Sequence, residues 1–315
     1  MADPAHSRPD SPPRRGRHAG SAARTLCRLA IAAVCLLPLH LSSALAQPGP
    51  PACSAGTLFL TFDTGSMSQA ELIADVLRRQ QVRATFFLAN ERTVRGDHAL
   101  DPSWAPYWRA LAADGHDFGT HTFHHSYLRT TRGGKVVVRP QFGPRAGQDV
   151  TMDQAAFCEE LDRSGQALRQ MTGATTLPLW RAPGGRTAAQ TLAWARHCGY
   201  RHVGWAQAGF LGDELDSERY PNSALLARAL RDLRDGDIAM AHLGIWSRQD
   251  PWAPAVLEPL IQGLRRKGFC FATLREHPAY QAFIAESMQQ SAAPAAGQGA
   301  AASAPAAPAM QRRQR

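Results

Sequence analysis

The chain has 315 residues, enough for one domain of roughly 200–250 residues plus tails, and its formal net charge is +9. Nine of the 35 basic and two of the 26 acidic residues fall in segments 1–46 and 291–315, which leaves 26 basic against 24 acidic residues between them. The central part is therefore nearly neutral, and this balance argues against a nucleic-acid-binding protein.

The first segment, residues 1–46, has the pattern of a secretory signal peptide. An apolar run at 29–41 is followed by Ala44-Leu45-Ala46, which has the small-x-small form of a cleavage site. The arginines that lead into the run are Arg14, Arg15, Arg17, Arg24 and Arg28. The run is too short to span a bilayer, so we expect a periplasmic or secreted protein with no stable membrane insertion after cleavage. An uncleaved anchor is the alternative.

After a Pro-rich linker at 47–56, strand and helix patterns alternate over residues 57–280. The expected strands are 58–62, 82–89, 116–121, 177–180, 201–205, 237–241 and 269–273. The expected helices are 68–80, with Ser68 as N-cap, 104–113, 153–171, 187–197, 223–233 and 256–267. This alternation predicts a single α/β domain whose mostly parallel sheet is closed or nearly closed.

Two segments depart from the alternation. Residues 129–150 form an insert in which Gly133-Gly134 and the valines at 136–138 predict a hairpin. The insert is either a plain surface loop or a cationic lip beside a site, carried by Arg132, Lys135 and Arg139. Residues 291–315 are rich in Ala and Pro without apolar periodicity, which predicts a disordered tail.

Four cysteines follow residue 46, namely Cys53, Cys158, Cys198 and Cys270. In an exported protein an even number suggests disulfides, and four cysteines allow three connectivities. If the strands follow chain order around a barrel, Cys53 before the first strand and Cys270 in the last become neighbours on closure. We therefore hypothesise the pairs Cys53–Cys270 and Cys158–Cys198.

Ionisable residues stand at the ends of the predicted strands. Asp63 directly follows the first strand, and barrel proteins gather reacting groups at the carboxyl ends of their strands. His121 and His125 follow another strand and are four residues apart, so one helical turn or a tight loop would direct both imidazoles to one point. Zinc sites built on neutral imidazoles use this spacing.

Two further strand ends carry such groups. Arg181 follows the strand at 177–180, and because a buried guanidinium needs a carboxylate partner, Asp63 is the natural candidate. His242 ends the strand at 237–241 and is the third histidine of the set. A histidine titrates near neutral pH and suits proton transfer.

These motifs, in this order, resemble the polysaccharide deacetylase superfamily, also known as the NodB homology domain or carbohydrate esterase family four. The resemblance rests on Thr61-Phe-Asp-Thr-Gly65, His121-Thr-x-x-His125, Arg181-x-Pro183 and Met240-x-His242, and it covers about residues 57–275. It implies a distorted (β/α)7-type barrel and metal-dependent removal of acetyl groups from sugars, commonly by hydrolysis of the amide bond in N-acetylglucosamine polymers.

The resemblance also implies roles for the motif residues. His121 and His125 would bind a divalent metal of the zinc type, Asp63 would be the general base, Arg181 would orient Asp63, and His242 would be the general acid. The expected partner is an acetylated polysaccharide.

The chain departs from the family pattern at two places. Thr64 stands where the family usually has a second aspartate as third metal ligand, so weakened metal binding is expected. The family's Asp-Trp motif, whose aspartate tunes the acid histidine, is poorly matched, and Asp213 or Asp216 is the candidate. His116, Asp117 and His124 are further donors nearby in sequence.

Three functions therefore remain open at the level of sequence. The first is an exported, metal-assisted deacetylase of glycans, and the second is a non-catalytic glycan-binding relative that lost a ligand at Thr64. The third is a metal-free hydrolase of the same fold that acts on a small amide. The presence of Asp63, Arg181 and His242 together favours an enzyme, because binding alone does not require an acid and a base.

Overall fold

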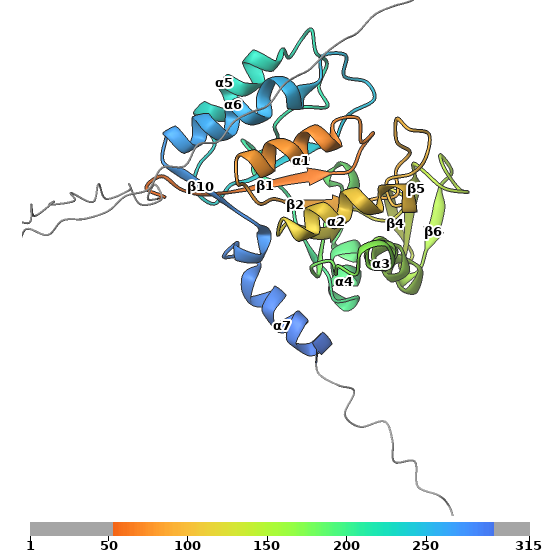
Figure 1. Ribbon diagram of the computed structural model, residues 1–315. Helices are drawn as coiled ribbons and strands as arrows, with labels where there is room; N and C mark the ends of the chain where they lie inside the picture. The colour runs from red at the N-terminus through yellow and green to blue at the C-terminus, as the bar shows by residue number, and fades with distance from the viewer. Residues whose placement is uncertain (1–52, 293–315) are drawn as a thin grey trace, which may run out of the picture. The chain divides into compact units, whose positions relative to one another are not determined.

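A computed structural model describes residues 53–292 and contains a seven-stranded parallel sheet (Figure 1). Strand β1 is central and pairs with β2, β9 and β10, while β3, β7 and β8 continue the sheet beyond β2. The strands are β1 Gly56–Asp63, β2 Thr85–Leu88, β3 Asp117–Thr120, β7 Leu179–Trp180, β8 Arg201–His202, β9 Ile238–His242 and β10 Phe269–Ala272.

The segment that follows β8 runs beside β9 and partly fills the gap between these strands. Met240 in β9 donates its amide to the carbonyl of Gly209 (2.7 Å) and accepts a hydrogen bond from the amide of Leu211 (3.2 Å). The sheet is therefore curled into a distorted barrel. The predicted fold class, an α/β barrel of the (β/α)7 type in a single domain, is confirmed.

Helices surround the sheet, because each strand is followed by an amphipathic segment whose apolar face needs a partner. Figure 1 shows α5 and α6 next to α1, with α2, α3 and α4 following around the sheet. The helices are α1 Ala70–Arg79, α2 Ala105–Ala113, α3 Gln154–Thr172, α4 Ala189–His197, α5 Asn222–Asp232, α6 Trp252–Arg266 and α7 Gln281–Ala292.

Alternate side chains of strand β1 point to opposite faces of the sheet and so belong to two different parts of the core. Leu58, Leu60 and Phe62 pack into the large cluster beneath the helices, whereas Phe59 belongs to a second cluster with residues of the other strands. Asp63 shares the parity of Phe59 and is buried. The alternation therefore directs the Asp63 side chain towards the inside of the curled sheet.

Helix α7, which the sequence did not predict, contributes to the inner cluster. Its Ile284 is 1% exposed and packs in the same cluster as Phe59 and Ile238, which lies at the start of β9. The helix therefore covers the end of the barrel opposite to the carboxyl ends of the strands.

The insert after β3 forms a separate antiparallel sheet of three strands, β4 Ser126–Arg132, β5 Lys135–Pro140 and β6 Val150–Met152. Gly133 and Gly134 both adopt positive φ angles at the turn, so the predicted hairpin is confirmed, with β6 as an unpredicted third strand. Its apolar side packs against α3 and α4.

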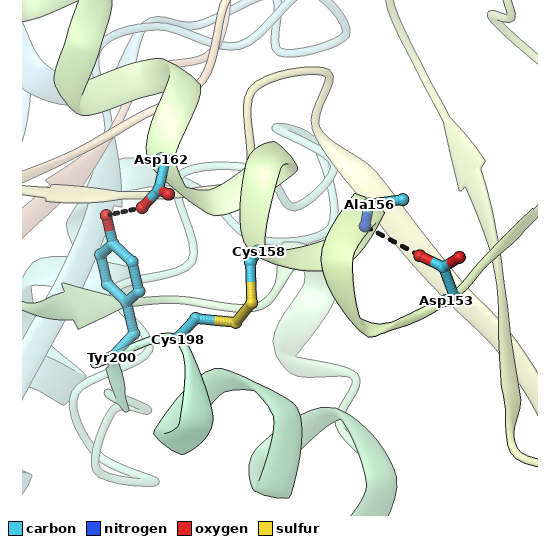
Figure 2. Close-up of a disulfide and its surroundings, with 6 residues drawn as sticks. All are labelled: Asp153, Ala156, Cys158, Asp162, Cys198 and Tyr200. Atoms are coloured by element: carbon cyan, nitrogen blue, oxygen red, sulfur yellow. Dashed lines mark hydrogen bonds between the residues drawn. A yellow bond between two sulfur atoms is a disulfide. The ribbon is translucent and has the colours of Figure 1, made fainter. Parts of the chain in front are cut away.

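Both hypothesised disulfides are present. Cys53 bonds Cys270, because β10 pairs with β1 in the register Thr57 to Cys270. Cys158 in α3 bonds Cys198 at the end of α4, as Figure 2 shows. The same view shows the Asp153 carboxylate accepting from the amide of Ala156 at the start of α3.

Helix boundaries differ from prediction most clearly at α1. The helix begins at Ala70, and neither Ser68 nor Gln69 caps it through a side chain. The preceding backbone is instead bound to the segment after β9, with Ser66 N donating to Gly244 O (2.8 Å) and Gln69 N to Leu243 O (3.0 Å). These long-range bonds fix the start of the helix, so the predicted N-cap at Ser68 is wrong.

The predicted signal peptide at 1–46 and the predicted tail from residue 293 onward lie outside the described residues. Within residues 53–292, none of the helices has the length and apolar character needed to cross a membrane.

Candidate active site

The centre of the site is a buried ion pair between Asp63 and Arg181. Arg181 Nη1 donates to Asp63 Oδ1 at 2.8 Å, and the two side chains are 3% and 0% exposed. The guanidinium also donates to the carbonyls of Val203 and Gly204, both at 3.4 Å, and lies over the ring of Phe87. Burial raises the pKa of Asp63, but Arg181, with His121 and His242, lowers it below its ordinary value. Asp63 is therefore an ionised carboxylate in a fixed orientation.

His121 lies beside this pair, with its Nε2 3.5 Å from Asp63 Oδ2. Its Nδ1 is 2.9 Å from the carbonyl oxygen of Arg181. A carbonyl only accepts, so Nδ1 carries the proton and Nε2 presents a lone pair. Burial lowers the pKa of His121 to about 4, which keeps the imidazole neutral near pH 7.

His125 is next to His121, with 4.8 Å between the ring centroids. The two histidines come from a tight loop in which Thr122 and His125 adopt positive φ angles of 59° and 50°. Such backbone conformations are uncommon for these residue types and occur often at functional sites. The two imidazoles lie next to each other, and a loop places them there.

Glu160 of α3 holds this histidine loop in place. Its Oε1 accepts hydrogen bonds from the His124 amide (2.8 Å) and the Ser126 hydroxyl (2.9 Å), while Oε2 is 2.8 Å from His124 Nδ1. Its own carbonyl accepts from the amide of Phe123 at 3.1 Å. The loop is therefore anchored to a long helix on the side away from the site.

His242 lies directly beside Asp63, because the two residues are register partners in β9 and β1. Asp213 accepts from the His242 amide at 2.6 Å, and its carboxylate oxygens are 3.1 and 3.2 Å from His242 Nδ1. Burial lowers the pKa of His242, but Asp213 outweighs burial and raises it to about 10. His242 is therefore protonated near pH 7, and Asp213 is the partner that the sequence left open between Asp213 and Asp216.

Thr64 contacts a carboxylate that sequence reasoning missed. The Thr64 hydroxyl donates to Glu91 Oε1 at 2.5 Å, and the amide of Gly65 donates to the same oxygen at 2.8 Å. Burial raises the pKa of Glu91, but His125 and these two donors lower it below its ordinary value. The signal was present, since Glu91 follows the predicted strand at 82–89 much as Asp63 follows the first strand.

The other donors near the histidine motif are engaged elsewhere. His116 Nδ1 accepts from the amide of Ala84, Asp117 pairs with Arg275, and His124 pairs with Glu160. Asp216 accepts from the amide of Arg219. None of these contacts includes Asp63, His121 or His125.

The cationic lip is only partly free. Arg139 forms an ion pair with Asp149 at 2.7 Å, so one of the three positive charges of the lip is neutralised. Arg129 is 3.9 Å from the same carboxylate. Arg132 and Lys135 stand at the exposed hairpin turn.

Residues 52–203 match the family described as polysaccharide deacetylase. These residues include the Asp63, histidine and Arg181 motifs described above. Residues 52–203 belong to the polysaccharide deacetylase superfamily. This confirms the resemblance found in the sequence, and it confirms the predicted enzyme class, a family of hydrolases that act on amide-linked acetyl groups.

Two curated relatives of this deacetylase chain carry peptidoglycan deacetylase names. The peptidoglycan-N-acetylglucosamine deacetylase of Bacillus cereus is 22% identical over 218 residues, which are 69% of this chain and 85% of that protein. The peptidoglycan-N-acetylmuramic acid deacetylase of Bacillus subtilis is 25% identical over 219 residues, 69% of this chain and 70% of that protein.

Solved structures share the fold of this chain. A family 4 acetyl xylan esterase from Clostridium thermocellum, in complex with a cobalt ion, has a TM-score of 0.55 at 20% identity and covers 72% of this chain and 92% of its own. A pseudoenzyme of the same family from Bacillus anthracis has a TM-score of 0.51 at 16% identity and covers 72% of this chain and 69% of its own. The fold therefore occurs in both active and inactive members.

Deacetylases of this family generally depend on a metal ion, and the donor chemistry of the site fits one. His121 presents a lone pair at Nε2, and His125 Nδ1 is buried without a hydrogen-bond partner among the described residues. Within residues 53–292, however, no three His, Cys, Asp or Glu side chains are already arranged as a closed ligand cluster. Two imidazoles are thus available, and a third protein ligand is not preassembled.

Proposed function

We propose that this protein is an exported hydrolase that removes acetyl groups from a polysaccharide containing N-acetylglucosamine. The observation that carries the proposal is the pairing of Asp63 with His242 in adjacent strands. Each has a buried partner of opposite charge, Arg181 for Asp63 and Asp213 for His242. An ionised base and a protonated acid therefore stand side by side, which is the requirement for hydrolysis of an amide at neutral pH.

The proposed mechanism uses these two groups in sequence. Asp63, held by Arg181, takes a proton from the water that attacks the acetyl carbon. His242, held by Asp213, then gives its proton to the sugar nitrogen as the carbon–nitrogen bond breaks, so that acetate and a free amine leave. Without that proton the amine would be a poor leaving group.

A divalent ion held by His121 and His125, which we propose to be of the zinc type, would polarise the acetyl oxygen and lower the pKa of water. Imidazole nitrogens are common zinc ligands, so both side chains are suited to this role. Their loop, anchored by Glu160, keeps them next to Asp63.

A groove beside the site supports a glycan as the substrate class. Its lining comes from loops after β2 and β9 and from the insert, and comprises Arg92, Thr93, Val94, Gly96, Phe142 and Trp246. Trp246 is 59% exposed, and the Phe142 ring centroid is 6.3 Å from that of His125. Exposed aromatic faces at a groove are suited to packing against sugar rings. The names of the peptidoglycan deacetylase relatives agree with this substrate class.

Two features support export. The apolar run and small-x-small site in residues 1–46 have the form of a signal peptide, and the Cys53–Cys270 and Cys158–Cys198 disulfides suit an oxidising compartment. We therefore propose a periplasmic or secreted location.

Thr64 favours one alternative, a glycan-binding protein without catalysis. Acetate release from peptidoglycan fragments and N-acetylglucosamine oligomers, measured with metal-free protein and after addition of zinc or cobalt, separates the two functions. We expect metal-dependent release of acetate. Binding of the glycan with no acetate released at any metal concentration would instead support the non-catalytic alternative.

A further inference from the structure

We propose that Glu91 supplies the carboxylate ligand of the metal site, in place of the aspartate that the family usually carries where this chain has Thr64. The inference rests on the proposed metal-assisted function and assigns a residue to it. Glu91 lies just after β2, the strand next to β1, and its carboxylate reaches the turn at Thr64 and Gly65.

Glu91 is the exception among the buried carboxylates of the described residues. Asp63, Asp117 and Asp213 each have a basic partner, Arg181, Arg275 and His242, and Glu160 has His124. Glu91 is 6% exposed and forms no ion pair with a basic side chain of residues 53–292. A buried charge without a counter-charge is costly, so this position is suited to receive a cation.

The hydrogen bonds of Glu91 leave one oxygen available. Oε1 accepts both the Thr64 hydroxyl and the Gly65 amide, whereas Oε2 has no hydrogen-bond donor among the described residues. Thr64 is fully buried and its hydroxyl also accepts from the amide of Ala89 at 3.2 Å. The threonine is therefore committed to holding Glu91 and is not itself free to bind an ion.

Two imidazoles complete the donor set. Glu91 lies beside the histidine loop, because the amide of the preceding residue Asn90 donates to the Phe123 carbonyl at 2.7 Å and the His121 amide donates to the Leu88 carbonyl at 2.8 Å. His125 Nδ1 is buried and unpartnered among the described residues, and His121 presents Nε2. Two histidines and one glutamate are a ligand combination found in catalytic zinc sites. Since the three side chains are not preassembled, binding would include a side-chain adjustment of Glu91.

The competing explanation is that Glu91 has only a structural role and stabilises the turn at Thr64 and Gly65 by accepting hydrogen bonds from it. Glu91→Gln separates the two, because a glutamine oxygen still accepts both hydrogen bonds but carries no charge. A second variant, Thr64→Asp combined with Glu91→Gln, moves the carboxylate to the usual family position. Glu286→Gln, which neutralises an exposed glutamate of α7, is the matched control.

The test is calorimetric titration of metal-free protein with zinc, and with cobalt monitored also by its visible absorption. We expect Glu91→Gln to weaken zinc binding by at least about 10- to 100-fold, since even groups outside the ligand set contribute that much. The double variant should recover most of the affinity and Glu286→Gln should match the wild type.

Wild-type affinity in a folded Glu91→Gln variant would overturn the assignment. If that variant does not fold, the double variant decides: affinity near that of the wild type supports the exchange, and undetectable binding contradicts it. Acetate release is measured separately, so a wild type that binds metal through Glu91 but releases no acetate would refute the proposed function and leave the metal assignment standing.

Discussion

At the scale of single residues, the site is determined by which buried groups are charged. Asp63 and Arg181 neutralise one another, as do Asp213 and His242. Asp63 is thereby kept ionised and His242 protonated, each beside a partner of opposite charge. Such separation of the pKa values of neighbouring groups is how acid and base roles are assigned in other hydrolases.

The protonated state of His242 predicts the pH dependence of the reaction. Its pKa is raised from 6.5 to about 10 by Asp213, against burial and with support from Asp63 and Glu214. We expect kcat/KM to fall as pH rises through about 10, and Asp213→Asn to move this basic limb to lower pH. A pH–rate profile of both proteins checks this; an unmoved limb in Asp213→Asn would contradict the role of Asp213.

The raised pKa of His242 also makes the stability of the protein depend on pH. Because the folded pKa of His242 lies above its unfolded value, its contribution to the free energy of unfolding is fully present below about pH 6.5. That contribution is lost as pH rises from there through about 10. The Asp213 variant should therefore show a weaker dependence of stability on pH in this window.

Residue-level prediction from sequence succeeded where one motif residue needed one partner. Arg181 had to find a carboxylate, and it found Asp63. Prediction from sequence failed for Glu91, because the role of a carboxylate after β2 depends on the Thr64 hydroxyl that donates a hydrogen bond to it. Asp213 and Asp216 could not be separated either, since the choice depends on the course of the loop before α5.

At the scale of elements, the histidine loop depends on α3. Four hydrogen bonds or close polar contacts connect Glu160 to the segment from Phe123 to Ser126. The positive φ angles of Thr122 and His125 have a conformational cost, and this anchorage offsets it.

Glu160→Gln should therefore loosen the loop. We expect a loss of about 1–3 kcal/mol in the free energy of unfolding, the usual effect of weakening buried hydrogen bonds to a charged group. Metal affinity should fall as well, because both imidazoles lie on the loop. Denaturant unfolding and metal titration provide the readouts, with Glu159→Gln, an exposed neighbour on α3, as control. Equal behaviour of the two variants would show that the anchor is unimportant.

Element boundaries show where local patterns stop being informative. The Ser68 capping pattern predicted the start of α1 two residues too early, because Leu243 and Gly244 bind the backbone at this point. Helix α7 was missed because its sequence has weak amphipathic periodicity, and its place depends on Ile284 reaching the inner cluster.

At the scale of the whole molecule, the order of strands and helices and the alternation of side chains along each strand could be predicted from sequence. These two features were sufficient to bring the motifs together. The parallel pairing of β1 with β10 also follows from that topology, and with it the Cys53–Cys270 disulfide. The shortness of β7 and β8 and the bridging segment after β8 could not be predicted, since they depend on how the curled sheet closes.

The disulfides should contribute to the stability of the whole domain. Cys53–Cys270 closes a segment of 217 residues and Cys158–Cys198 one of 40, and each restricts the unfolded chain. We expect removal of either bridge by Cys→Ser pairs to cost about 2–5 kcal/mol. Unfolding in guanidinium with and without reductant measures this. Insensitivity of the wild type to reductant at every denaturant concentration would argue against a stabilising role.

Acetate release by Asp63→Asn tests most directly whether Asp63 acts as the base beside His242. The variant should lose about 10²- to 10⁴-fold in rate, the usual contribution of a general base. It should also lose about 3–5 kcal/mol of stability because Arg181 becomes unpaired, so the assay is made well below its melting temperature. Asp216→Asn serves as control. We expect acetate release by the wild type and the control and almost none by Asp63→Asn. An Asp63→Asn protein as active as the wild type would contradict the role of Asp63 as base.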